Sequence, residues 1–149
     1  MNIRSPYGQL ARCTWLARII DKVRQDQAGT LRREYREYLC NPRAMDGLFL
    51  HFFNIAPDEF INNVREHSTD EDLERWFLRL HGVTPEKIRQ WNNFVVPLGS
   101  AGTCSHSKFQ KARKTIYFGC DDPGVQTFYD IIDWDEGRFP NPDKSQYLT

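Results

Sequence analysis

The chain has 149 residues, of which 40% are apolar and 27% are charged, values close to those of ordinary globular domains. Its 20 basic and 20 acidic side chains give a formal net charge of zero, which provides no overall field to attract nucleic acid or anionic lipid. The composition therefore excludes a disordered chain and disfavours a general nucleic-acid-binding protein. We expect a single folded domain over residues 1–149, because a chain of this length can bury its own core.

No apolar run in the sequence approaches the roughly 18 residues that a membrane-spanning helix requires. Residues 1–24 lack the uninterrupted apolar segment of a secretory signal peptide, and the 4 cysteines are widely spaced, which is typical of reduced thiols. We therefore expect a cytoplasmic protein with no membrane attachment. Cys104 and His106 form one close pair without a second pair at zinc-site spacing, so we expect no metal and no cofactor.

The first third of the chain contains signals for three helices. Ser5-Pro6 is typical of a helix opening, and the apolar spacing after it predicts a helix over residues 6–27. A second helix must end near Asn41-Pro42, because the residue before proline avoids the helical conformation. The strongly apolar segment 44–55 is predicted to be a buried central helix.

The middle of the chain is predicted to form three consecutive helices with clear start signals. Pro57, with two acids directly after it, opens a helix over residues 57–66. Ser68 and Glu71 have capping-box spacing ahead of the second helix. Thr84 precedes a proline and an acid that open the third.

The last third contains weaker signals. Residues 98–108 are small and polar and are predicted to form a flexible loop, and residues 115–120 are compatible with a short extended piece. The apolar run after Gly124 has helical spacing, and residues 140–149 form a tail. We therefore predict an all-α (mainly α) fold, an irregular bundle of about six to seven short helices.

On the first predicted helix, Arg18, Asp21, Lys22 and Gln25 lie opposite the apolar stripe, and Arg24 follows Asp21 across one turn. One interpretation is a solvated face, whose ion pairs contribute only about 0.2–0.5 kcal/mol each. The other is that a second element covers this face. The three cations would then bind an anionic group such as a carboxylate or phosphate, and Asp21 would orient them.

Asp46 lies just ahead of the most apolar segment, and His51 lies within it. Both are candidate catalytic residues. A carboxylate in such surroundings must be paired or have a raised pKa, as a general acid or base does. The alternative is that Asp46 caps the helix and His51 is an ordinary boundary histidine. Trp76 and Trp91 either belong to the aromatic core or line a ligand pocket between helices.

Several short phrases of the chain are typical of one protein family. They are Arg4-Ser5-Pro6 ahead of Leu16, Arg18, Asp21, Lys22 and Arg24, then Thr69-Asp70-Glu71 ahead of Trp76, then Trp91-Asn92, then Asp135–Arg138. In these phrases the chain resembles the domain-of-unknown-function family 5069 of small bacterial proteins. The resemblance covers most of the chain and implies no activity. The stretch from Gly99 to Cys120 is longer and more polar than the pattern of that family.

Two functions fit these observations. The first is a small-molecule site between helices, binding or enzymatic, which takes a small anionic metabolite through Arg18, Asp21, Lys22 and Arg24. The second is a regulatory or adaptor module without catalytic activity, whose basic N-terminal face or acidic tail docks a partner protein. Residues 1–43 carry more basic than acidic side chains, and the closing segment reverses that balance. Nucleic acid fits worst, because the net charge is zero.

Overall fold

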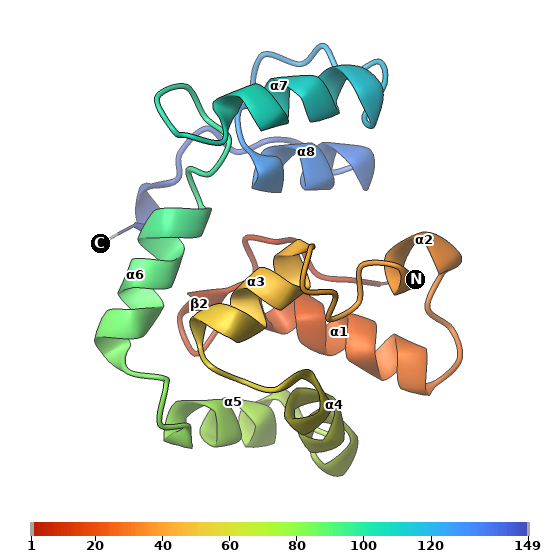
Figure 1. The fold of residues 1–149 in the computed structure, drawn as a ribbon, viewed down its shortest axis with the longest axis vertical. Helices are drawn as coiled ribbons and strands as arrows, with labels where there is room; N and C mark the ends of the chain where they lie inside the picture. Colours follow the sequence, from red (N-terminus) through yellow and green to blue (C-terminus); the bar gives the residue numbers. More distant parts are fainter. Residues whose placement is uncertain (1, 149) are drawn as a thin grey trace. The chain divides into compact units, whose positions relative to one another are not determined.

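A computed structural model describes residues 2–148 (Figure 1). Within these residues the chain forms eight α-helices and one two-stranded antiparallel sheet, so the predicted mainly α fold is confirmed. The strands are β1 (Gln9–Leu10) and β2 (Cys13–Thr14). The helices are α1 (Leu16–Gln27), α2 (Arg33–Arg36), α3 (Met45–Phe52), α4 (Pro57–Glu66), α5 (Asp70–Arg79), α6 (Pro85–Val95), α7 (His106–Thr115) and α8 (Phe128–Asp135), followed by a 3-10 turn, η1 (Ser145–Tyr147). Within residues 2–148 no helix has the length and hydropathy needed to cross a bilayer.

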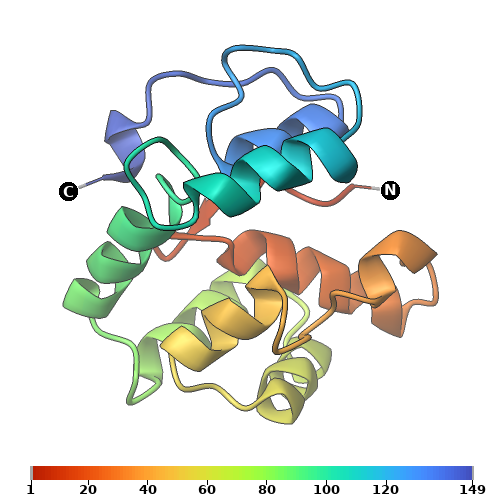
Figure 2. The ribbon, with the colours of Figure 1, turned by 45° about the horizontal axis from the view of Figure 1, so that its top comes forward.

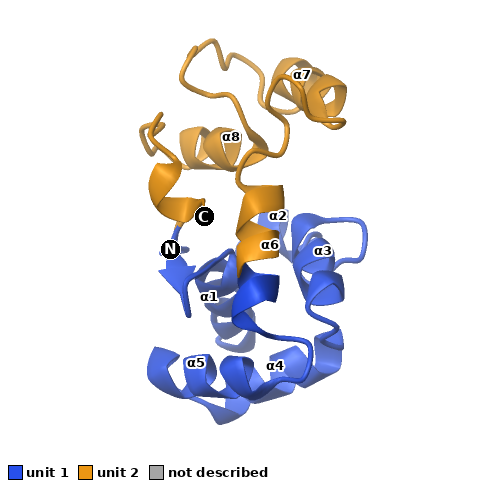
Figure 3. Ribbon diagram, turned by 90° about the vertical axis from the view of Figure 1, so that its left-hand side faces the viewer, with its two compact units in different colours: residues 1–4, 8–88 blue, residues 5–7, 89–149 orange. Residues whose placement is uncertain are grey.

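The chain divides into two compact units, shown in different colours in Figure 3. Unit 1 contains residues 1–4 and 8–88, and unit 2 contains residues 5–7 and 89–149. The boundary therefore falls within α6. Each unit is described by itself below.

The helix predicted to begin at Pro6 is wrong in its first half, because the chain makes a β-hairpin before α1 begins. Gln9 pairs with Thr14 and Leu10 with Cys13, so only Ala11 and Arg12 connect the strands. Both connecting residues have positive φ, 56° and 59°, as a type I′ turn requires. Neither is the asparagine or glycine that normally marks such a turn, so the sequence lacked the usual signal.

The core of unit 1 is built by buried apolar residues of α1, α3, α4 and α5, and the ribbons of these helices lie near one another in Figures 1 and 2. Helix α1 packs on α4. The aromatic centre consists of Phe49, Phe53 and Phe77, whose ring centroids lie 5.1–6.1 Å apart. All three rings are almost completely buried, so these short helices share one continuous apolar core.

The three middle helices begin close to the predicted positions. Helix α4 begins at Pro57 and ends at Glu66, which confirms its predicted bounds. The Thr84 hydroxyl accepts a hydrogen bond from the backbone N–H of Lys87 at the start of α6. The cap of α5 is displaced by one residue, because Thr69, and not Ser68, accepts the hydrogen bond from the backbone of Asp72.

Unit 2 contains α7 and α8, which lie beside each other in Figures 1 and 2. The apolar cluster of this unit is Phe109, Cys120, Val125 and Ile131, with Tyr117, Phe128 and Trp134 packed against it. Helix α8 begins with a complete capping box, in which Thr127 and Asp130 each bind the other's backbone N–H. Helix α7 is an element that the sequence did not predict.

The predictions for residues 98–120 therefore need correction. Residues 98–105 form turns, as expected of a loop, but residues 106–108 are the first turn of α7. Residues 115–120 form the end of α7 and a turn in place of the extended piece. The turn pattern of Gly99 and Gly102 is visible in the sequence, whereas α7 buries one apolar side chain, Phe109, and so has no apolar stripe to reveal it.

Residues 5–7 belong to unit 2 because they bind the acidic side chains of α8. The Ser5 hydroxyl donates to Asp133 over 2.8 Å, and the Tyr7 hydroxyl donates to Asp130 over 2.7 Å. Burial, together with the hydrogen bond to Asp130, raises the pKa of Tyr7. The ion pairs of α8 go to basic residues that follow it in the chain, since Asp133 binds Arg138 and Asp130 lies 3.3 Å from Lys144.

We predict that Thr69→Ala lowers the free energy of unfolding by about 1 kcal/mol, because α5 loses its N-cap. Ser68→Ala is the matched control, and we expect it to change stability far less. Chemical denaturation followed by tryptophan fluorescence measures both variants. A larger loss for Ser68→Ala than for Thr69→Ala would contradict the cap assignment.

Candidate functional site

Asp46 lies at the centre of a buried polar cluster in unit 1. Its Oδ1 accepts hydrogen bonds from the indole Nε1 of Trp15 over 2.9 Å and from Nζ of Lys22 over 2.6 Å. Its Oδ2 accepts a third hydrogen bond, from the backbone N–H of Cys40 over 3.1 Å. The side chains of Asp46 and Lys22 are 0% and 4% exposed, so this is a dry ion pair that three segments share.

Burial governs the titration of this cluster. Desolvation lowers the pKa of Lys22, and the negative charge of Asp46 opposes that change. Burial raises the pKa of the Cys40 thiol to about 12, and the nearby Asp46 carboxylate adds to the increase. Cys40 is therefore an unreactive thiol near neutral pH.

Arg18 is as deeply buried as Lys22, since each residue is 3% exposed. Its guanidinium lies 5.3 Å from the centroid of the Trp15 ring and 5.9 Å from that of Tyr35. Its Nη1 also donates to the backbone carbonyl of Arg4 over 3.1 Å. Part of the polar face of α1 is therefore covered by other elements, as the second of the two interpretations required.

The remaining charges of this face form a separate, half-buried network. Arg4 binds Asp21 through Nε over 2.9 Å and Asp70 through Nη1 over 2.7 Å. Arg24 binds the other oxygen of Asp70 over 2.8 Å. The hydrogen bond from Arg4, followed by that from Arg24, holds the pKa of Asp70 below its usual value.

The residues predicted from the sequence thus separate into two groups. Lys22 and Asp46 meet in the buried cluster, and Asp21 and Arg24 meet in the half-buried network. In both groups the cations form ion pairs with carboxylates of the chain, so the geometry explains how the segments are joined. A ligand-binding role for these residues stays a prediction.

The other predicted residues lie outside these groups. His51 is exposed, whereas Asp46 on the same helix is buried, so the structure does not join them as an acid and a base. Trp76 is half-buried and packs edge-on against Phe60 in unit 1. Trp91 is fully buried in unit 2, with its ring 6.3 Å from that of Phe94. Both tryptophans therefore pack against aromatic neighbours of their own unit.

We predict that Asp46→Ala lowers the free energy of unfolding by about 3–5 kcal/mol, because Lys22 is left buried without its carboxylate. Asp26→Ala is the control, since Asp26 is an exposed acid of the same region. Urea unfolding measures both. A loss for Asp46→Ala no larger than that of the control would show that the buried pair does not hold unit 1 together.

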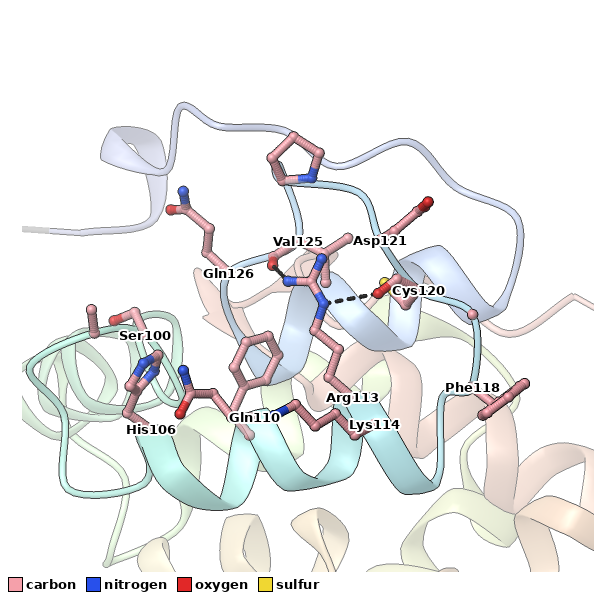
Figure 4. A pocket seen from close by; sticks show the side chains of 14 residues that line it. Ser100, His106, Gln110, Arg113, Lys114, Phe118, Cys120, Asp121, Val125 and Gln126 are labelled. Atoms are coloured by element: carbon pink, nitrogen blue, oxygen red, sulfur yellow. Dashed lines mark hydrogen bonds between the residues drawn. The ribbon is translucent and has the colours of Figure 1, made fainter.

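Unit 2 contains a cavity of about 800 Å³ between α7 and the chain that follows it (Figure 4). Its lining residues come from the turns before α7, from α7 itself and from the loop that leads toward α8. They are Ser100, Ala101, His106, Phe109, Gln110, Arg113, Lys114, Phe118, Gly119, Cys120, Asp121, Pro123, Val125 and Gln126. Phe109 and Val125 of this lining also belong to the apolar cluster of the unit.

Three polar residues line the cavity from one side of α7. His106, Gln110 and Lys114 follow each other at intervals of four residues, which places them on one face of the helix. Figure 4 shows their side chains in a row, with the Lys114 side chain extending along the helix toward Gln110. The Lys114 and Gln110 side chains are exposed, so their polar ends can reach a bound molecule.

Arg113, the neighbour of Lys114, builds the opposite wall. Its guanidinium donates to the carbonyls of Cys120, Asp122 and Val125 over 2.9, 2.7 and 2.8 Å. Figure 4 marks the bonds to Cys120 and Val125. These three charge-assisted hydrogen bonds attach the loop to α7, so Arg113 shapes the cavity while its donors point at protein carbonyls.

The turn before α7 fixes the orientation of His106. Its Nδ1 lies 2.8 Å from the carbonyl of Gly99, and because a carbonyl can only accept, Nδ1 carries the proton. The other ring nitrogen, Nε2, is then left for a ligand. Gly99 itself has φ of 97°, and a Cβ there would lie 3.0 Å from Phe128 and 3.1 Å from Phe109. Only glycine fits this position.

Two cations, Arg113 and Lys114, and one acid, Asp121, line the cavity. Residues 98–120 contain no acid and four cations, Lys108, Lys111, Arg113 and Lys114. Asp121 is the single acid among the described residues that line the cavity. Two features of the sequence could have indicated this site, namely the acid-free stretch and the four-residue spacing of His106, Gln110 and Lys114. Because no helix was predicted there, the spacing did not indicate that the three side chains share one face. Among residues 2–148 no group of three or more potential metal ligands is present.

We predict that Arg113→Ala detaches the loop from α7, because three carbonyls lose a charged donor. The free energy of unfolding should fall by about 1.5–3 kcal/mol. Amide hydrogen exchange in residues 120–126 should become faster. Lys111→Ala, on the exposed side of the same helix, should leave both measurements unchanged. Unchanged exchange in the Arg113 variant would contradict the clamp.

A family model described as Domain of unknown function (DUF5069) matches residues 1–138. The match confirms the family resemblance and includes every residue that lines the cavity. No curated protein matches the chain.

Proposed function

We propose that this chain, which belongs to the family of the domain of unknown function DUF5069, binds a small organic anion in the cavity between α7 and residues 119–126. The observation that carries the proposal is the combination of an organic-ligand-sized cavity with a lining in which cations outnumber acids. The function of the protein would then be to bind a small anionic metabolite. This moves the site expected from the sequence from α1 to α7.

The size of the cavity supports an organic ligand. Its volume of about 800 Å³ lies within the range of roughly 300–1,000 Å³ that is usual for small-molecule sites. An inorganic ion alone would leave most of this space to water. The apolar surface of Phe109 and Val125 can cover the carbon skeleton of a ligand, and the polar row of α7 can bind its charged or hydrogen-bonding groups.

The electrostatics support an anion. Lys114 extends an ammonium group along the cavity side of α7, and no ion pair within residues 2–148 involves it. Gln110 can donate from its amide. The stretch 98–120 carries no carboxylate side chain, and Asp121 is the single acid among the described residues of the lining. Partly enclosed charges of this kind attract an anion more strongly than exposed ones do.

The proposal also has a cellular part. We place the protein in the cytoplasm of a bacterium, where its cysteines remain thiols. Cys13, Cys40, Cys104 and Cys120 are all free, which supports a reducing compartment.

An adaptor role is the second candidate function, and one observation supports it. Phe139, in the acidic closing segment, is 94% exposed. Exposed aromatic side chains are frequent anchors of protein interfaces. The cavity favours the small-molecule function, because it provides a volume and a set of polar groups, whereas a single exposed ring provides neither.

The test is a thermal-shift screen with carboxylates and phosphates of metabolite size. We expect at least one anion to raise the melting temperature of the wild-type chain and of Lys111→Gln. The same anion should give no shift with Lys114→Gln. Both lysines are exposed residues of α7, so both variants should fold. A screen without any shift, or an equal loss in the Lys111 variant, would contradict the proposal.

A further inference from the structure

We infer that the anion bound in this cavity also carries a hydroxyl group, which donates a hydrogen bond to Nε2 of His106 where α7 begins. The inference rests on the proposed function, because it describes another part of the same ligand. It depends on where two side chains, His106 and Ser100, place their own protons. Both protons go to backbone carbonyls, so this end of the cavity is left with hydrogen-bond acceptors.

His106 and Ser100 are neighbours in the turn that leads into α7. Both side chains are half-buried and line the cavity. The carbonyl of Gly99, which is bonded directly to Ser100, lies 2.8 Å from Nδ1 of His106. The backbone N–H of Gly99 donates to the Ser105 hydroxyl over 2.9 Å and closes the same turn. Figure 4 accordingly shows Ser100 and His106 close together, so one turn sets the positions of both side chains.

The His106 ring can accept a hydrogen bond from a ligand. Its Nδ1 carries a proton, because the Gly99 carbonyl can only accept. A neutral imidazole has one proton, so Nε2 then holds a lone pair. Within residues 2–148 Nε2 has no hydrogen-bond partner, and the ring's other contact is with Phe109, 6.4 Å away between ring centroids. A donor on the ligand is the group that satisfies this nitrogen.

The Ser100 hydroxyl is restricted in the same way. It donates its single proton to the carbonyl of Pro97 over 2.6 Å. The oxygen keeps lone pairs, so toward a ligand it acts as an acceptor. Two adjacent lining groups, from Ser100 and His106, therefore require a donor at one place. Anion binding by itself does not explain this arrangement, because carboxylate and phosphate oxygens without a proton cannot donate.

A hydroxyl group is the donor that fits the charges of the lining. The cations Arg113 and Lys114 line the cavity, and Asp121 is the single acid among the described lining residues. An ammonium group would add a positive charge to a lining in which cations already outnumber acids. A hydroxyl group donates a hydrogen bond without carrying a charge. We therefore expect a hydroxylated anion and not an amino acid.

Helix geometry sets the spacing of the two groups of the ligand. The Lys114 side chain extends toward Gln110 in Figure 4, which places a bound anionic group near Gln110. His106 precedes Gln110 by four residues, which is roughly 6 Å along a helix. The ligand would thus carry its hydroxyl and its anionic group at about that separation, as short hydroxy acids and hydroxyalkyl phosphates do.

Two matched sets of probes test the inference by titration calorimetry at about pH 8, where free imidazole is neutral. The first set is 3-hydroxypropyl phosphate, propyl phosphate and 3-aminopropyl phosphate. The second is 5-hydroxypentanoate, pentanoate and 5-aminopentanoate. In at least one set we expect the hydroxyl probe to bind about tenfold more tightly than both partners, because only the hydroxyl satisfies the two acceptors without adding charge.

Variants assign this preference to the two acceptors. The side-chain amide of His106→Asn can still donate to the Gly99 carbonyl, but it has no atom in the place of Nε2. It should therefore keep the melting temperature and the affinity for the probe without a hydroxyl, while losing the preference. Ser100→Ala should reduce the preference as well. Lys114→Gln should weaken the members of a set alike, and Lys111→Gln is the control that changes nothing.

The outcomes separate the inference from the proposed function. If an anion raises the melting temperature in the screen but no hydroxyl probe binds more tightly than its partners, the inference fails and anion binding stands. A preference that persists in both His106→Asn and Ser100→Ala also overturns the inference, as does a preference for the amino probes. If no anion binds to the wild-type chain in either experiment, both proposals fail.

Discussion

The carboxylate of Asp46 is the constraint on which unit 1 depends most. It joins the residue before α1, the middle of α1 and the chain ahead of α3, through Trp15, Lys22 and Cys40. Trp15 and Cys40 have positive φ, 74° and 52°, and such backbone conformations cost about 1–3 kcal/mol each in residues other than glycine. The hydrogen bonds to one buried oxygen pair hold both conformations in place. Asp46 is therefore best understood as an acceptor that organises the unit.

Unit 2 uses a guanidinium where unit 1 uses a carboxylate. Arg113 binds three backbone carbonyls of one loop, which leaves the side chains of that loop free to line a cavity. The next residue, Lys114, points about 100° away around the helix and faces the cavity. The two adjacent cations therefore have different roles, because Arg113 forms part of the cavity wall and Lys114 is available to a ligand. The buried charges of α1 make no such division, since Lys22 binds the Asp46 carboxylate and Arg18 donates to the carbonyl of Arg4.

Local signals predicted α4 well and α1 poorly, for a physical reason. Pro57 and the acids after it act on the first turn of their own helix, so neighbouring residues decide where α4 begins. The start of α1 depends on Trp15, whose left-handed conformation is held by Asp46 from 31 residues away. A pattern within residues 5–16 contains no information about that bond. Ser5, the expected cap, belongs to unit 2 and donates to Asp133 of that unit over 2.8 Å.

By itself the sequence determined the mainly α class, the family and the middle helices, and it left open whether the ionic face of α1 is solvated or covered. Each of these depends on periodicity, capping residues or short phrases that lie close together in the chain. Only the tertiary structure decided which carboxylate pairs with which cation, and that α7 with its loop encloses a cavity. Arg113 reaches carbonyls 7, 9 and 12 residues away, and these bonds exist only after the loop has folded back on the helix. Composition shows that charges are balanced, whereas the fold decides where they meet.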